Sequence, residues 1–110
     1  MNARRLRAVA VGALLLPHYL PAAPKPAEAA VAIDNFTFKD ATLIVPVGAR
    51  VTWTNRDDIP HTVTAEAGPP DFHSHPLDTG DRFSETFDKP GTYRYFCAIH
   101  PKMRGTVIVR

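Results

Sequence analysis

The chain ends in Tyr95-Phe96-Cys97-Ala98-Ile99-His100-Pro101-Lys102-Met103-Arg104-Gly105-Thr106-Val107-Ile108-Val109-Arg110, and this segment is the most informative about its fold. Two runs rich in aromatic and β-branched residues enclose a short segment that holds Cys97, His100 and Met103. Such residues favour strands, so the sequence predicts two strands joined by a tight loop. A thiol, an imidazole and a thioether therefore fall within one loop.

These three side chains are the donor types that suit copper. Two His and one Cys with a weak axial Met form the blue-copper ligand set. The missing imidazole has a candidate in His61, which follows a separate extended segment. We therefore predict a copper site formed by His61, Cys97, His100 and Met103. Four protein ligands leave no open position of the kind that catalytic metal sites keep, so the pattern argues against an enzyme.

Each ligand also has a plainer interpretation. Cys97 could be an inert buried thiol, His61 a structural histidine after Pro60, and Met103 a filler of irregular core space. The composition of residues 1–30, described below, indicates export, and exported domains normally use disulfides. The chain has a single cysteine, however, which cannot form an internal disulfide. A bound metal would occupy that thiol and stabilise a small domain. The cysteine count thus agrees with the copper interpretation.

Residues 1–30 have the composition of an export signal. A cationic start with Arg4, Arg5 and Arg7 precedes an apolar run over residues 8–16, and a Pro- and Ala-rich segment ends in small residues at Ala30. This order is typical of a secretory signal peptide. The apolar run is too short to span a bilayer, which needs about twenty residues. We predict a signal peptide and Pro/Ala-rich segment over 1–30, a copper-binding domain over 31–110, and no stable membrane span. An uncleaved anchor or a disordered arm is the alternative.

The charge of the predicted domain differs from that of the whole chain. The chain carries a formal net charge of +2, but four of its 13 cationic residues precede residue 31. Nine cationic and ten acidic residues remain after that point. Because nucleic-acid binding depends on a surplus of clustered Lys and Arg, we expect no nucleic-acid partner.

The rest of the chain reads as short strands separated by Gly, Pro and Asp, which indicates an all-β sandwich or barrel. The expected strands are 31–38, 42–47, 50–55, 62–65, 82–87, 92–96 and 106–109. In Arg50-Val51-Thr52-Trp53-Thr54-Asn55 apolar and polar residues alternate, so one face is predicted to be buried. A long irregular stretch over 66–81 contains His73 and His75. We favour a solvated loop there over a second metal site, and a solvated turn at Asp57-Asp58.

The chain resembles the cupredoxins over residues 34–109. The resemblance is carried by the compact, amicyanin-type spacing of the loop and by these motifs: Val51-Thr52-Trp53-Thr54-Asn55-Arg56, Ile59-Pro60-His61, Pro90-Gly91-Thr92-Tyr93-Arg94-Tyr95-Phe96-Cys97 and Arg104-Gly105-Thr106-Val107. It implies a Greek-key β-sandwich with one type 1 copper ion at one end. One departure is Thr62, where Asn is common in the family. That difference leaves open how the Cys97 loop is hydrogen-bonded.

The resemblance also implies a function and a location. The expected protein is a periplasmic, monomeric carrier of single electrons between transient redox partners of the dehydrogenase or c-type cytochrome class. His100 would be the ligand that reaches an apolar surface, with Pro60, Ile99 and Pro101 as candidates for its rim.

Two other functions stay open at this point. The domain could buffer or deliver copper in the periplasm, with His73 and His75 as the entry site. More remotely, Cys97 and His100 could form the nucleophile and base of a hydrolase.

Overall fold

The computed structural model describes residues 12, 17, 19–21 and 25–110, so most of the predicted signal peptide lies outside the described residues. The described part is all-β, with eight strands and no helix. No helix long and apolar enough to cross a membrane is found among the residues described. The strands are β1 (Glu28–Asp34), β2 (Thr37–Lys39), β3 (Thr42–Val45), β4 (Ala49–Asn55), β5 (Thr64–Ala65), β6 (Arg82–Phe87), β7 (Gly91–Phe96) and β8 (Arg104–Val109).

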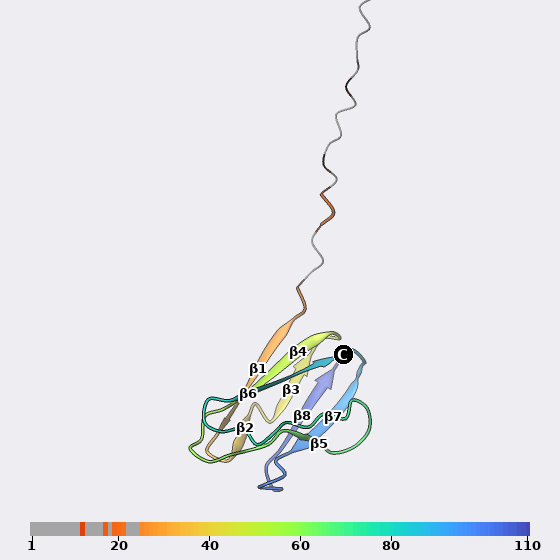
Figure 1. Ribbon diagram of the computed structural model, residues 1–110. Helices are drawn as coiled ribbons and strands as arrows, with labels where there is room; N and C mark the ends of the chain where they lie inside the picture. Colours follow the sequence, from red (N-terminus) through yellow and green to blue (C-terminus); the bar gives the residue numbers. More distant parts are fainter. Residues whose placement is uncertain (1–11, 13–16, 18, 22–24) are drawn as a thin grey trace, which may run out of the picture.

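The strands form two four-stranded sheets, as Figure 1 shows. One sheet has the order β2-β1-β4-β6 and the other β3-β8-β7-β5. Each sheet is mixed, because β1 pairs parallel with β4 and β3 pairs parallel with β8, while the other pairs are antiparallel. The predicted all-β Greek-key sandwich is confirmed.

The core lies between the sheets and is rich in aromatic side chains. The alternation predicted for β4 is confirmed, since Val51 and Trp53 are fully buried while Thr52 and Thr54 are only partly covered. Trp53 makes an edge contact with Tyr95 at a centroid distance of 5.3 Å. Tyr95 is fully buried, and burial raises its pKa to about 12. The phenol therefore stays neutral in the core at physiological pH.

The first predicted strand, 31–38, is wrong in detail. The chain turns at Asn35 and Phe36, whose φ angles of 50° and 55° lie in the left-handed region. The two halves then pair with each other as β1 and β2. The apolar pattern continues through the turn, which is why the sequence reads as one strand. At its other end β1 begins at Glu28, before the predicted domain boundary at residue 31, and pairs with β4 from its first residue.

The long stretch 66–81 is irregular, as expected, but part of it belongs to the core. Phe72 and Leu77 are 3% and 5% exposed. Leu77 exchanges two backbone hydrogen bonds with His61, and the Ser74 N–H donates to the Val63 carbonyl. The stretch thus covers the segment that follows β4 and fixes the backbone of His61.

Three connections meet at one end of the sandwich. Figure 1 shows the β1–β2 turn, the segment after β4 and the β7–β8 loop together at the end opposite the start of β1. The pairing agrees with this view, since the parallel strands β1 and β4 end on the same side, and Thr64, soon after the segment that follows β4, pairs with Phe96 at the end of β7. Residues far apart in the sequence are therefore close together at this end.

Candidate metal centre

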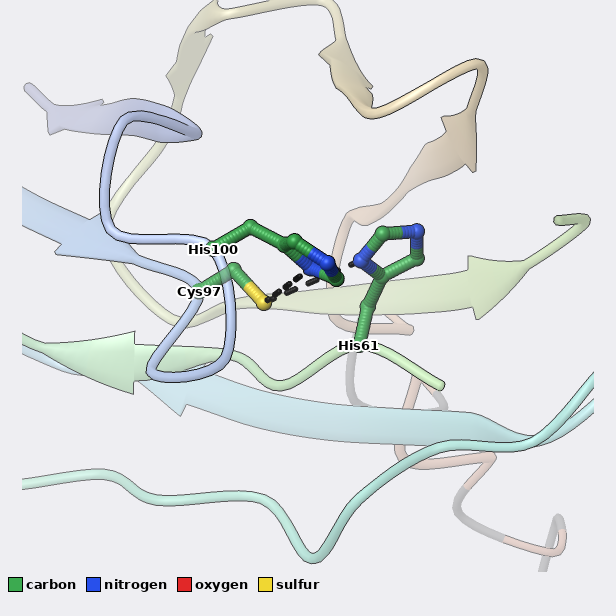
Figure 2. Close-up of side chains that lie close together, drawn as sticks. All are labelled: His61, Cys97 and His100. Atoms are coloured by element: carbon green, nitrogen blue, oxygen red, sulfur yellow. Dashed lines mark hydrogen bonds between the residues drawn. The ribbon is translucent and has the colours of Figure 1, made fainter. Parts of the chain in front are cut away.

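Three of the four predicted ligands converge at this end. Cys97 directly follows β7, and its Sγ lies 3.7 Å from His61 Nδ1 and 3.8 Å from His100 Nδ1 (Figure 2). The donor atoms of the three residues all lie within 4.8 Å of one another. Among the described residues, this is the one group of His, Cys, Asp and Glu side chains placed to hold a metal ion.

The separations between these donors fit a single ion. Bonds of about 2.0 Å to imidazole nitrogen and about 2.3 Å to thiolate sulfur are typical of a first-row metal such as zinc. An ion with trigonal angles and such bonds puts sulfur and nitrogen about 3.7 Å apart. The two observed sulfur–nitrogen distances agree with this value. Thiolate with two imidazoles is also the equatorial set of a blue-copper site.

The loop between β7 and β8 is closed by its own backbone. The Cys97 N–H donates to the Met103 carbonyl at 3.1 Å, and the Met103 N–H donates to the His100 carbonyl at 2.9 Å. Met103 is buried, with 6% of its surface exposed, and lines the same surface hollow as His100. The loop therefore holds the three predicted ligands of this segment in a fixed register. Ligation by the Met103 sulfur stays a prediction.

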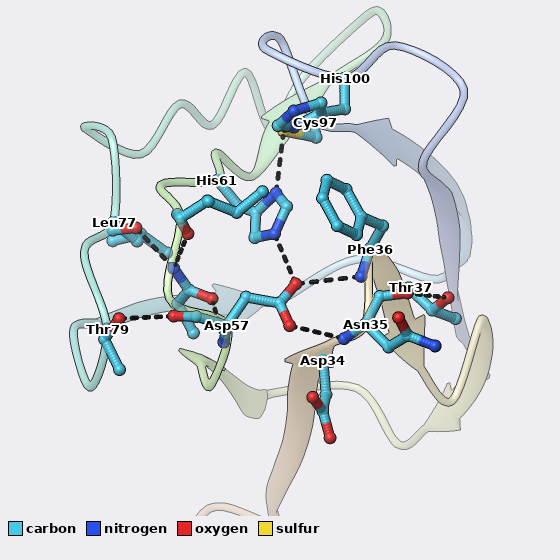
Figure 3. Close-up of polar contacts among 12 residues, drawn as sticks. Asp34, Asn35, Phe36, Thr37, Asp57, His61, Leu77, Thr79, Cys97 and His100 are labelled. Carbon is cyan, nitrogen blue, oxygen red and sulfur yellow. Dashed lines mark hydrogen bonds and ion pairs between the residues drawn. The ribbon is translucent and has the colours of Figure 1, made fainter.

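His61 is held from its other ring nitrogen. Its side chain is fully buried, and Nε2 lies 2.7 Å from Oδ2 of Asp57 (Figure 3). Burial raises the pKa of Asp57, but hydrogen bonds from the Phe36 amide, from His61 and from the Asn35 amide outweigh it and lower the pKa below its usual value. The expectation of a solvated turn at Asp57-Asp58 is therefore wrong for Asp57, whose side chain is only 11% exposed.

Thr62 makes hydrogen bonds to the Cys97 loop, which answers the question raised by its difference from the common Asn. Its Oγ1 accepts from the Ala98 N–H at 2.7 Å, and its own N–H donates to Cys97 Sγ at 3.3 Å. Hydrogen bonds to a metal-bound group orient it and tune its properties. Thr62 thus connects the His61 segment to the Cys97 loop across the site.

Thr62→Val is expected to lower the free energy of unfolding by about 1–3 kcal/mol, because it keeps the branched shape but leaves the Ala98 N–H without its acceptor. Thr62→Ser, which keeps the hydroxyl, is the control and should retain most of the stability. Denaturant unfolding of both variants measures the difference. Equal stability of the Val and Ser variants would contradict the assigned role.

His100 reaches the surface beside an apolar hollow of about 490 Å³. The hollow is lined by Phe36, Ile99, His100, Pro101, Lys102 and Met103. Ile99 and Pro101 were expected at this rim, whereas Pro60 is not among the lining residues. Phe36 was missed, and its side chain is half exposed. Only the turn between β1 and β2 brings it here, and the one local signal of that turn is an Asn before an aromatic residue.

His73 and His75 do not join the site. The side chain of His73 is 57% exposed, and its Nε2 pairs with Asp71 Oδ1 at 2.7 Å. His75 is exposed as well. A solvated loop describes both residues better than a second metal site, as the sequence indicated.

A β-sandwich with a buried cysteine and two histidines at one end defines a copper-binding cupredoxin. The family model for copper-binding proteins of the plastocyanin/azurin family matches residues 26–110. The chain belongs to this family, and its cofactor is one type 1 copper ion.

Two relatives of this chain are amicyanins. Amicyanin-alpha of Methylorubrum extorquens is 35% identical over 105 residues, which cover 93% of this chain and 85% of that protein. Amicyanin of Paracoccus denitrificans is 39% identical over 93 residues, covering 80% of this chain and 71% of the relative. A purple cupredoxin from Nitrosopumilus maritimus superposes with a TM-score of 0.69 and 36% identity, covering 74% of this chain and 99% of the other. The relatives indicate a cupredoxin electron carrier.

Proposed function

We propose that this protein carries single electrons between redox partners through a type 1 copper ion held by His61, Cys97, His100 and Met103. The observation that carries the proposal is the convergence of Cys97 Sγ with the Nδ1 atoms of His61 and His100 at one end of the sandwich. Met103 is assigned as the weak axial ligand because it closes the same loop and is buried beside His100.

The role of the polypeptide is to hold the donor atoms in place before and after each electron transfer. Copper, when bound, alternates between Cu(I) and Cu(II) and so stores one electron. Backbone hydrogen bonds fix the donors on two segments. One set lies within the Cys97–Met103 loop, and the other joins Leu77 to His61. Donors held in this way would limit the rearrangement around a bound ion when its oxidation state changes, which would favour fast electron transfer.

The exposed part of the site suits a brief encounter with another protein. His100 lies at a hollow whose rim includes the exposed side chains of Phe36 and Ile99 and the cation Lys102. A small apolar surface of this kind fits the small interfaces of transient redox complexes. We assign no catalytic role, and we expect a monomer whose partners belong to the dehydrogenase or c-type cytochrome class.

Residues 1–30 and the amicyanin relatives support an exported location. We place the protein in the periplasm, exported by a signal peptide. The Ala27 carbonyl accepts a hydrogen bond from the Arg50 N–H, and β1 begins at Glu28. Cleavage anywhere after Ala27 would remove one or both of these features, so we expect the mature chain to begin at or before Ala27. N-terminal sequencing of the exported protein tests this.

Optical and EPR spectra of the copper-loaded protein test the proposed function. An intense blue band and a narrow copper hyperfine splitting are expected from a trigonal site with a thiolate ligand. Fast electron self-exchange, measured by NMR line broadening in mixtures of the two oxidation states, is expected as well. A colourless Cu(II) form would reject the proposal.

Copper buffering or delivery is the weaker alternative. It would use His73 and His75 as an entry site, but among the described residues neither histidine belongs to a group of three donors placed to hold an ion. A delivery protein must also release its ion readily, whereas two of the three clustered donors, His61 and Cys97, are fully buried. Fast transfer of copper to a competing chelator would favour delivery, and slow transfer is expected.

Met103→Leu is expected to keep copper but to raise or lower the reduction potential, because the axial bond is long and weak. The leucine preserves the apolar volume, so stability should change by less than about 1.5 kcal/mol. Metal analysis and protein-film voltammetry measure the two effects. Complete loss of copper from this variant would show that Met103 is not the axial ligand.

A further inference from the structure

The carboxylate of Asp57 binds two separate parts of the chain that meet at the metal end. Its Oδ2 lies 2.7 Å from His61 Nε2 and accepts the Phe36 N–H at 2.9 Å. Its Oδ1 accepts the Asn35 N–H at 2.6 Å. Figure 3 shows the carboxylate between the imidazole of His61 and the backbone of the β1–β2 turn. Three N–H donors therefore share one acceptor group.

The backbone of Asp57 is itself fixed. Its N–H donates to Asn55 Oδ1 at 2.9 Å, and its carbonyl accepts the Thr79 hydroxyl at 2.5 Å. The amide group of the buried Asn55 donates to the carbonyls of Ile59 and Leu77. These bonds anchor Asp57 both to the end of β4 and to the 77–79 segment, so its backbone is fixed by contacts that do not involve His61.

The first consequence concerns the protonation of His61. An ionised carboxylate only accepts hydrogen bonds, so the Nε2 atom beside it carries the proton. In the neutral ring Nδ1 then keeps its lone pair, and Nδ1 is the atom that faces Cys97. A carboxylate on the far nitrogen of a metal-binding His fixes both the tautomer and the ring orientation.

The second consequence concerns the turn that carries Phe36. Both Asn35 and Phe36 have positive φ angles, which are costly for a bulky residue such as Phe. The two turn amides bound by Asp57 belong to these residues. The Phe36 ring in turn makes edge contacts with His61 and His100, at centroid distances of 5.5 and 5.2 Å. The carboxylate thus holds the conformation that keeps this ring against both histidines.

We propose that Asp57 is a positioning residue that couples the orientation of His61 to the placement of Phe36 over the histidine pair. The proposal rests on the proposed copper site and deepens it. The Asp57 carboxylate would orient His61 toward the ion. It would also keep the Phe36 ring at the surface where a redox partner would dock. Loss of the carboxylate should disturb both features together.

Asp57→Asn tests this coupling with little change of shape. The amide has one acceptor oxygen for three N–H donors, and its NH₂ group must face at least one of them. Asp58→Asn is the matched control, since Asp58 is the exposed neighbouring acid and the variant has the same net charge. In the copper-free chain, Asn35 and Phe36 amide exchange should accelerate on the order of tenfold in Asp57→Asn. Nitrogen-15 NMR should show that His61 loses its fixed Nε2–H tautomer.

The copper-loaded variants give the second measurement. Copper release to a chelator should accelerate on the order of tenfold or more in Asp57→Asn, and its EPR hyperfine splitting should change. Asp58→Asn should match the wild type in every measurement. Should Asp57→Asn fail to fold, the wild type still provides a test, since its His61 must be the Nε2–H tautomer and its Phe36 amide must be protected.

Two results would overturn the proposal. One is an Asp57→Asn variant that behaves like Asp58→Asn throughout. The other is faster exchange at the turn with an unchanged His61 tautomer and copper spectrum, which would make Asp57 an anchor of the turn alone. Failure of the proposed function is recognised separately, because a wild type that forms no blue copper site leaves the copper-free NMR result intact.

Discussion

Cys97→Ser is expected to abolish the blue colour of the copper-loaded protein entirely. The colour of such a site depends on a short, covalent bond between copper and a thiolate. A serine hydroxyl is a harder donor that stays protonated at neutral pH, so it cannot replace that bond. Cys97 is fully buried, and its Sγ is the atom that faces both Nδ1 atoms. Optical and EPR spectra, with metal analysis of the same samples, measure the loss.

Ala98→Ser is the matched control for this variant. It adds a hydroxyl at the next residue of the same loop, where the side chain is exposed, and should remain blue. Circular dichroism of Cys97→Ser should match the wild type, because the substitution is nearly isosteric. A blue band that persists in Cys97→Ser would mean that the sulfur is not a ligand.

Much of the fold was predictable because it depends on local patterns. The alternation in 50–55 identified the buried face of β4, and the Pro-Gly turn at 90–91 located the start of β7. The break at Asn35 and Phe36 was not predictable in the same way. Its backbone conformation is held by the carboxylate of Asp57, which is more than twenty residues away in the chain. A conformation that depends on a distant partner leaves no local periodicity to read.

In the site, too, some residues were predictable from the sequence and others were not. Cys97, His100 and Met103 lie in one loop, so their spacing alone predicts their proximity. His61 was found because a blue-copper site needs a second imidazole, and the structure places its ring beside the other two donors. Asp57 was missed because two adjacent acids usually mark a solvated turn. Phe72 and Leu77 were missed because the Pro- and Gly-rich stretch around them reads as a solvent-exposed loop, although both are buried.

Gly105→Ala is expected to have the largest effect on stability of any conservative substitution at this end of the sandwich. Gly105 lies opposite Tyr95 in the β7–β8 pair. A Cβ at this position would lie 2.2 Å from Tyr95 Cζ and 2.3 Å from its hydroxyl oxygen. The ring cannot easily move away, because it is fully buried and packs against Phe38 and Trp53 at centroid distances of 4.8 and 5.3 Å.

The expected cost exceeds about 3 kcal/mol, at the upper end for overpacked cores. In a small domain this is a large part of a total stability of about 5–15 kcal/mol. The melting temperature should then fall by more than about 12 °C, at about 4–8 °C per kcal/mol. Thermal unfolding followed by circular dichroism measures the fall. A melting temperature within a few degrees of the wild type would contradict the prediction.

A double-mutant cycle tests whether the clash with Tyr95 is the cause. Leucine at position 95 would not reach the space that the phenol ring now occupies beside Gly105. Tyr95→Leu alone should destabilise the protein by leaving a cavity, but in that background Gly105→Ala should cost much less and partly fill the space. The coupling energy between the two substitutions should therefore be large and favourable. Additive effects would instead place the cost of Gly105→Ala in the backbone of β8, because the alanine would then be harmful whatever ring lay opposite it.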